Sequence, residues 1–198
     1  MLERISVSLQ TYYDTAIGAM NILEKGLAQV RETYIGAVLA EKTKELQDVY
    51  NETLKESRET NYGVCTEVLN GIDELVQEIL KVPVPADFIA TLEALKQINN
   101  PSKAEIETAV GAYRNNYYAY RAICDYLKTE KPVTVDDILE DVSYIRSNVY
   151  ECFYSDNLDG YHFLNWKDGT LMSTFDEKFT AFCDGRFEDI DILNPDIK

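Results

Sequence analysis

The sequence predicts a mainly α-helical protein: an elongated helical hairpin or bundle with a very long N-terminal helix and a small acidic α+β appendage at the C-terminus. Three observations predict this fold class. Apolar residues recur every three or four positions, no proline precedes Pro83, and most phenylalanines lie between Phe153 and Phe187. We therefore expect residues 1–131 to form the hairpin or bundle, and residues 132–198 to form an acidic, aromatic-rich helix followed by the appendage.

The N-terminal helix is predicted from one apolar stripe with helical spacing. Its members are Leu9, Tyr12, Ala16, Met20, Leu23, Leu27, Val30 and Tyr34. Because no proline interrupts it, this helix could run from Leu2 to about Asn61, on the order of 90 Å, either continuous or kinked at a glycine, with Gly63 as a stop or hinge. That length exceeds the diameter of a compact domain, so the stripe is a candidate helix–helix interface, within the chain or between subunits.

Shorter helices are expected in the middle of the chain. The sequence Val82-Pro83-Val84-Pro85 must end the preceding helix, because each proline forces the residue before it out of the α region. A short helix is predicted from Ala86 to about Ile98. Ser102 and Glu105 have the spacing of a capping box, which opens a helix that reaches Leu127.

The last third is predicted to contain one helix and a hairpin of strands. Thr134 begins a helix whose apolar stripe reaches Cys152. Residues 161–175 are expected to form a β-hairpin, because Asp168-Gly169 supplies the positive φ that a type I′ turn needs. Residues 176–182 could add a helical turn.

The charge of the chain is strongly negative and unevenly distributed. The chain has 198 residues, with 35 acidic and 19 basic side chains and a net charge of −16. Residues 132–198 hold 15 acids and 5 bases, which is −10 of that charge. We expect no direct nucleic-acid partner, because binding to a phosphate backbone would begin against Coulomb repulsion.

The acidic residues of the last third form a candidate partner surface. Its members are Asp136, Asp137, Glu140, Asp141, Glu188, Asp189 and Asp191. Three interpretations stay open: a solvated acidic face, a cation site, or a surface that imitates a phosphate array and occupies a basic groove.

Residues that would indicate a reaction are scarce. His162 is the single histidine, and the four cysteines form no CxxC pair. The glycines form no phosphate-binding motif. We therefore nominate no catalytic, cofactor-binding or metal-ligating residue and expect no cofactor and no enzymatic activity. Four tyrosines could form a stacking platform for nucleic acid, but a buried helical stripe is the favoured interpretation; they are Tyr113, Tyr117, Tyr118 and Tyr120.

No signal peptide or transmembrane segment is predicted. The N-terminus has an acid at Glu3 and no apolar region after it, and the most apolar uninterrupted run, Tyr34 to Ala40, has seven residues. We expect no membrane partner and a soluble protein of the host cytoplasm or of a virion.

Two short segments carry a resemblance. Leu9-Gln10-Thr11-Tyr12-Tyr13-Asp14-Thr15-Ala16, and Val82-Pro83-Val84-Pro85-Ala86-Asp87-Phe88 opening a short helix, resemble small acidic helical proteins encoded by phages and prophages of Gram-positive bacteria. The resemblance covers the first two thirds of the chain and implies a phage-associated, non-enzymatic context without residue roles.

These observations together favour a structural or assembly protein. It would act through helix-mediated self-association or by docking on a larger particle, as a virion component does. The alternative is an acidic counter-defence inhibitor that blocks a basic groove of a host protein.

Overall fold

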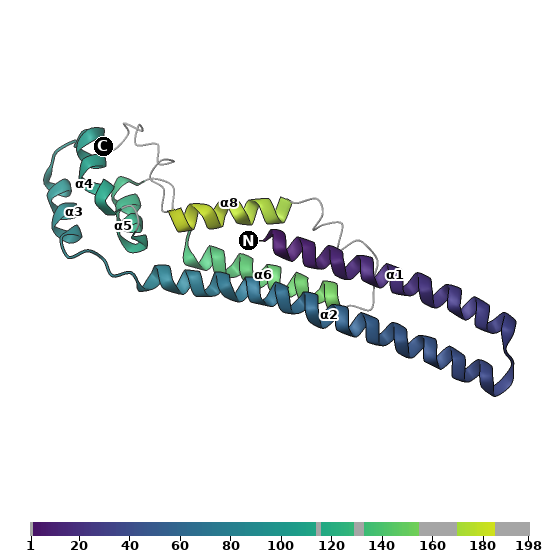
Figure 1. Cartoon of the computed structure of the whole chain (residues 1–198). Coiled ribbons are helices and arrows are strands. Elements are labelled where there is room, and N and C mark those ends of the chain that lie inside the picture. The colour runs from purple at the N-terminus through teal and green to yellow at the C-terminus, as the bar shows by residue number, and fades with distance from the viewer. Residues whose placement is uncertain (1, 114–115, 129–132, 155–169, 185–198) are drawn as a thin grey trace. The chain divides into compact units, whose positions relative to one another are not determined.

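Every regular element of the described chain is helical. The computed structural model describes residues 2–113, 116–128, 133–154 and 170–184 (Figure 1). The elements are α1 (Glu3–Thr33), α2 (Gly36–Lys81), α3 (Phe88–Gln97), α4 (Lys103–Val110), the 3-10 helix η1 (Gly111–Tyr113), α5 (Tyr117–Leu127), α6 (Val135–Tyr154) and α8 (Thr170–Asp184). The mainly α-helical fold class is therefore confirmed.

The predicted β-hairpin is wrong where it can be compared. Residues 161–169 lie outside the described residues, but residues 170–175 belong to α8. Phe175, Phe179 and Phe182 are spaced by four and three, which is helical spacing. That pattern outweighs the local Asp-Gly turn signal.

Contacts divide the chain into two units, each built from two segments. One unit joins residues 1–70 to 143–172, and the other joins residues 71–142 to 173–198. The division at residue 131 that composition suggests stays a prediction about domains.

The first unit contains a hairpin of two long helices rather than one very long helix (Figure 1). The backbone turns at Tyr34, which is extended, and at Gly36, whose φ is +60°. Glycine adopts this left-handed conformation without steric cost, which explains why the turn lies there. The predicted hinge at Gly63 is wrong, because α2 passes through that residue as regular helix.

The two helices of the hairpin are antiparallel and keep one register throughout. Arg4 lies 3.5 Å from Glu67, the Arg58 guanidinium donates to the Tyr12 hydroxyl over 3.4 Å, and a Cβ at Gly26 would lie 3.0 Å from the Leu46 side chain. In each facing pair the two residue numbers add to between 70 and 72. A residue in α1 can therefore be assigned its level partner in α2.

The end of α6 supplies a third helix at the open end of the hairpin. The ring of Phe153 lies 4.8 Å from that of Tyr12 and 5.7 Å from that of Tyr62, and Arg146 donates to Asn70 over 3.1 Å. Within residues 2–70, burial stops near the level where α6 ends. The last buried residue of α1 is Ala16 and the first of α2 is Asn61. Residues 17–60 are called the distal hairpin below.

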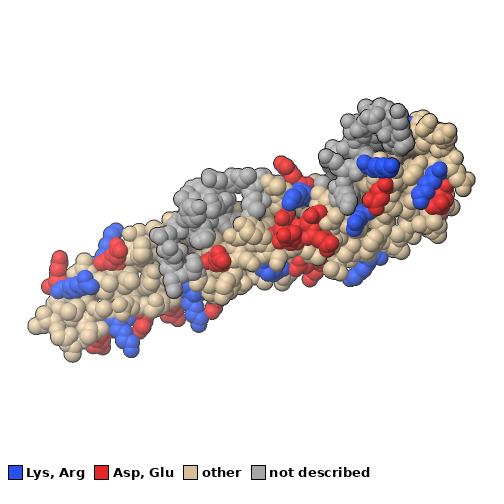
Figure 2. Space-filling view, turned by 180° about the vertical axis from the view of Figure 1, so that it is seen from behind, with Lys and Arg blue, Asp and Glu red and all other residues tan. Residues whose placement is uncertain are grey.

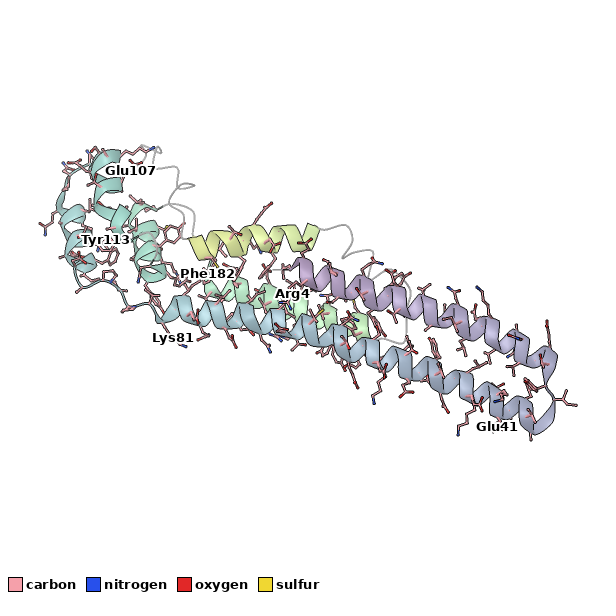
Figure 3. The ribbon with its side chains drawn as sticks, in the orientation of Figure 1. Arg4, Glu41, Lys81, Glu107, Tyr113 and Phe182 are labelled. Carbon is pink, nitrogen blue, oxygen red and sulfur yellow. The ribbon has the colours of Figure 1, made fainter. Side chains whose placement is uncertain are left out.

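The second unit has its core between α3, α4 and α5. The buried residues that form this core are Phe88, Leu92, Leu95, Ile106, Val110, Tyr113, Ala119, Ile123 and Leu127. Tyr126 donates to the Leu95 carbonyl over 3.1 Å, and the hydroxyls of Thr91 and Tyr113 lie 3.1 Å apart. Figure 3 shows Tyr113 among these helices.

The helix expected from Ser102 to Leu127 is interrupted. Its capping box is confirmed, since Ser102 and Glu105 exchange both capping hydrogen bonds. However, α4 ends at Val110, and α5 begins after Asn116, whose side chain caps the Ala119 amide and also donates to the Pro83 carbonyl over 2.9 Å. This side chain satisfies a helix end and a loop carbonyl together, which a continuous helix would not allow.

Candidate interaction surface on the distal hairpin

The distal hairpin has exposed apolar side chains, and the third helix, α6, contacts it at its base, where Arg58 lies against the Tyr154 ring. None of its residues falls in the buried class. Its large apolar side chains include Ile35, which is 88% exposed, Ile22 at 69% and Val49 at 62%. Single exposed apolar residues are ordinary, but a run of them on two paired helices is typical of an interaction surface.

The predicted interface stripe is only partly buried within the chain. Leu9, Tyr12 and Ala16 are buried, which agrees with a helix–helix contact. From there to the tip the stripe is covered less. Met20 and Tyr34 are exposed, and Leu23, Leu27 and Val30 are half-buried.

The most apolar run of the sequence forms the tip of the hairpin. Residues 34–40 comprise the connection between α1 and α2 and the first residues of α2, and all of them except Leu39 are exposed. Figure 3 marks the charged residue after this run, Glu41, at the tip, and the end of the hairpin is uncharged surface in Figure 2. Burying an isoleucine or valine gains about 1.5–3 kcal/mol, so this tip retains a driving force for contact.

One side of the hairpin combines the exposed apolar residues of both helices. Ile22 precedes the inward-facing Leu23 in α1, while Val38 and Val49 precede Leu39 and Tyr50 in α2. The two antiparallel helices are related by a two-fold axis perpendicular to the plane of the hairpin. This axis does not exchange the two sides of that plane. A residue that precedes an inward-facing residue therefore lies on the same side of the hairpin in both helices. The register puts Ile22 level with residues 49 and 50.

Lys42 and Glu45 lie on this same side, between the two valines. Their ammonium and carboxylate groups are 2.7 Å apart, and the hydrogen bond to Glu45 raises the pKa of Lys42. We call this side the hairpin flank. It consists of Ile22, Val38, Lys42, Glu45 and Val49.

The α1 residues on this side are uncharged. They are Thr11, Thr15, Gly18, Ile22, Gln29 and Thr33. The three threonine hydroxyls donate to backbone carbonyls four residues earlier, over 2.7 to 2.8 Å. Because these hydroxyls are bonded within the helix, the threonines add little polarity to a surface whose remaining polar side chain is Gln29.

Four residues of the predicted acidic surface lie in the first turns of α6, and two of them have partners within the chain. Asp137 caps α6 by accepting hydrogen bonds from the Thr134 hydroxyl and amide, which lower its pKa. Asp141 pairs with Lys178 of α8 at 2.8 Å, and this hydrogen bond raises the pKa of Lys178. Asp136 and Glu140 are exposed. The remaining members, Glu188, Asp189 and Asp191, lie outside the described residues.

Sequence reasoning missed an aromatic cluster around Arg58. Its guanidinium lies 5.1 Å from the ring centre of Tyr154, whose ring stacks on Tyr150 at 4.7 Å. Tyr62 packs edge-on against Tyr154 at 5.3 Å. The spacing of four between Tyr150 and Tyr154 is the signal that could have indicated one face of a helix.

A buried polar group of the first unit is Cys65. Burial raises the pKa of its thiol to about 12, the neighbouring Cys152 adds to this, and a hydrogen bond with Ser8 opposes it. The described residues hold no group of three His, Cys, Asp or Glu that could bind a metal ion. His162 lies outside those residues.

Comparisons with known proteins leave the function to be argued from the chain itself. No protein-family model, no curated protein and no solved structure matches it. A search of the described helices finds none that combines the length and apolar character of a membrane span.

Proposed function

We propose that this protein is a non-enzymatic, phage-associated assembly protein that acts through the distal hairpin. It associates with further copies of itself or docks on a larger particle such as a virion. The supporting observation is that α1 and α2 continue for roughly 27 Å beyond the last level at which they are buried, with apolar side chains exposed on the flank and at the tip.

An isolated pair of helices is a costly way to display apolar surface. Helices gain most of their stability by packing an apolar face. Beyond the contact of Arg58 with Tyr154 of α6, the two helices of the distal hairpin pack on each other, and their half-buried stripe supplies only part of that stabilisation. A partner that covers the flank would stabilise the distal hairpin as well as bind to it.

The inhibitor alternative has less support in the described residues. Two of the four described carboxylates of the acidic surface, those of Asp137 and Asp141, already have intramolecular partners. A basic groove would have to compete with those contacts for the same oxygens.

A shortened hairpin tests the proposal. Deleting residues 24–30 and 42–48 together removes two turns from each helix at matching levels, and it keeps the turn and the lower part of the hairpin. We expect the wild-type chain to associate in light scattering and small-angle X-ray scattering, or to co-sediment with the particle. The shortened chain should stay folded by circular dichroism and lose this binding. Equal binding by both chains would contradict the proposal.

A further inference from the structure

We propose that the hairpin flank is an interface between two copies of this chain, which pack face to face and antiparallel. In this arrangement α1 lies on α1 of the second copy and α2 lies on α2, so that the two distal hairpins form a four-helix bundle. This inference rests on the proposed function and names the partner and the contacting surface.

The flank of α2 is self-complementary about its own midpoint. Val38, Lys42, Glu45 and Val49 are spaced by four, three and four residues, which places them in one stripe. A two-fold axis at the level between residues 43 and 44 reverses the stripe. It then places Val38 on Val49 of the second copy and Lys42 on Glu45 of the second copy.

The same axis also matches the exposed residues of α1. The hairpin register puts the level between residues 43 and 44 in α2 opposite the level between residues 28 and 29 in α1. Reversal about that level places Ile22 at the level of Ile35 of the second copy. These are the two most exposed large apolar side chains of the distal hairpin. One axis, set by the α2 stripe alone, therefore brings Ile22 to the level of Ile35, which lies in the connection between α1 and α2.

The charges of the flank select the antiparallel arrangement. In a parallel pair that keeps α2 on α2, Lys42 would face Lys42 and Glu45 would face Glu45, and like charges in direct opposition are unfavourable. In the antiparallel pair each Lys42 instead faces Glu45 of the other copy, which gives two ion pairs across the interface. Lys42 and Glu45 also bridge each other within one chain at 2.7 Å, so the pairs between copies would share these groups with that bridge or replace it.

The distribution of charge along the chain explains why a second copy can approach here. Residues 17–60 hold eight acidic and six basic side chains, a net charge of −2, whereas the whole chain carries −16. The distal hairpin therefore contributes little to the repulsion between two copies.

The size of the surface suits a weak, transient interface. Because α2 begins at Gly36, an axis at the level between residues 43 and 44 overlaps residues 36–51 of the two copies, a face roughly 23 Å long and about 20 Å wide, on the order of 460 Å². Two such faces together cover about 900 Å², which is below the size of most stable interfaces. A weak, concentration-dependent dimer is the expected result.

Charge reversal tests the pairing of Lys42 with Glu45. In sedimentation equilibrium of the full chain, Lys42→Glu should weaken dimerisation at least tenfold, and Lys42→Glu combined with Glu45→Lys should restore it. Lys44→Glu is the matched control, because it makes the same charge change two residues away on the outward side of α2 and should leave dimerisation unchanged. The ion pair would be overturned if Lys42→Glu and Lys44→Glu weakened dimerisation equally, or if the double variant did not restore dimerisation.

Cross-linking tests the direction of packing. Val38→Cys and Val49→Cys are prepared separately in a Cys183→Ser background, which removes the one exposed cysteine of the described residues. With a short bis-maleimide, a mixture of the two variants should give a cross-linked dimer, and neither variant alone should. A cross-link in Val38→Cys alone would indicate a parallel pair and overturn the proposal.

The outcomes separate this inference from the proposed function. The proposed function is supported if the wild-type chain dimerises and the chain with the shortened hairpin does not. This holds even if charge reversal at Lys42 and Glu45 has no effect and the cysteine variants do not cross-link. In that case the flank is the wrong surface. A wild-type chain that stays monomeric throughout its soluble range overturns the second copy as partner. Loss of particle binding by the shortened chain would then still support docking.

Discussion

At the scale of single residues, Cys65 shows how burial sets chemistry. Its thiol is fully buried between helices, and burial raises its pKa from the ordinary 9.0 to about 12. The thiolate is the reactive form of cysteine, so Cys65 should react with a thiol reagent at pH 8 much more slowly than the exposed Cys183. Ellman's reagent with the native and the unfolded chain measures this difference, and equal rates in the native chain would contradict it.

The same pKa predicts a dependence of stability on pH. Because the folded state holds the Cys65 proton more tightly than the unfolded state, its contribution is complete below pH 9 and is lost as the pH rises toward 12. Urea unfolding between pH 7 and pH 10 should therefore show a decline that is smaller in Cys65→Ala. The comparison with the variant is required because lysines and tyrosines titrate in the same range.

At the scale of elements, two glycines of the hairpin should respond to alanine with opposite signs. Gly63 lies inside α2 with open space where a Cβ would go, so Gly63→Ala should stabilise the helix by about 0.5–1 kcal/mol. Gly36 has a φ of +60°, so Gly36→Ala should cost about 1–2 kcal/mol, because alanine is strained in the left-handed region. Thermal unfolding of both variants gives the two signs, and stabilisation by both would exclude the observed turn.

The hairpin should also show a gradient of local stability along its length. Amides near Ala16 and Asn61 lie beside the third helix, whereas amides near the tip belong to helices with one neighbour each. In hydrogen exchange of the dilute chain, protection should therefore fall toward the tip. Raising the protein concentration should increase protection in residues 17–60 and leave the α3–α5 core unchanged, because only the distal hairpin gains a partner.

At the scale of the whole molecule, the net charge of −16 determines how association responds to salt. Two such chains repel each other, and the screening length falls from about 30 Å at 0.01 M to about 10 Å at 0.1 M salt. Self-association should therefore strengthen over this range in sedimentation velocity. An inhibitor that binds a basic groove would show the opposite trend, with weaker binding as salt rises. The direction of the salt effect distinguishes the two functions.

Part of the fold and of the site was predictable because the signals are local. The capping box of Ser102 and Glu105 and the break at Pro83 follow from groups within four residues of each other. The apolar stripe from Leu9 to Tyr34 was visible for the same reason. The sequence did not reveal which residues cover each half of that stripe, because the covering residue Phe153 lies 141 positions from Tyr12.

The sequence by itself determined that this chain is helical and where its apolar stripes and its charge lie, because these depend on periodicity and composition. Only the tertiary structure decided that α1 and α2 fold back at Gly36, that α6 covers the first half of the stripe and that Asp137 and Asp141 have partners within the chain. Those outcomes depend on which distant residues meet in space. The tertiary structure also decided the register of the hairpin. That register places Ile22 on one surface with the residues Val38, Lys42, Glu45 and Val49 of α2.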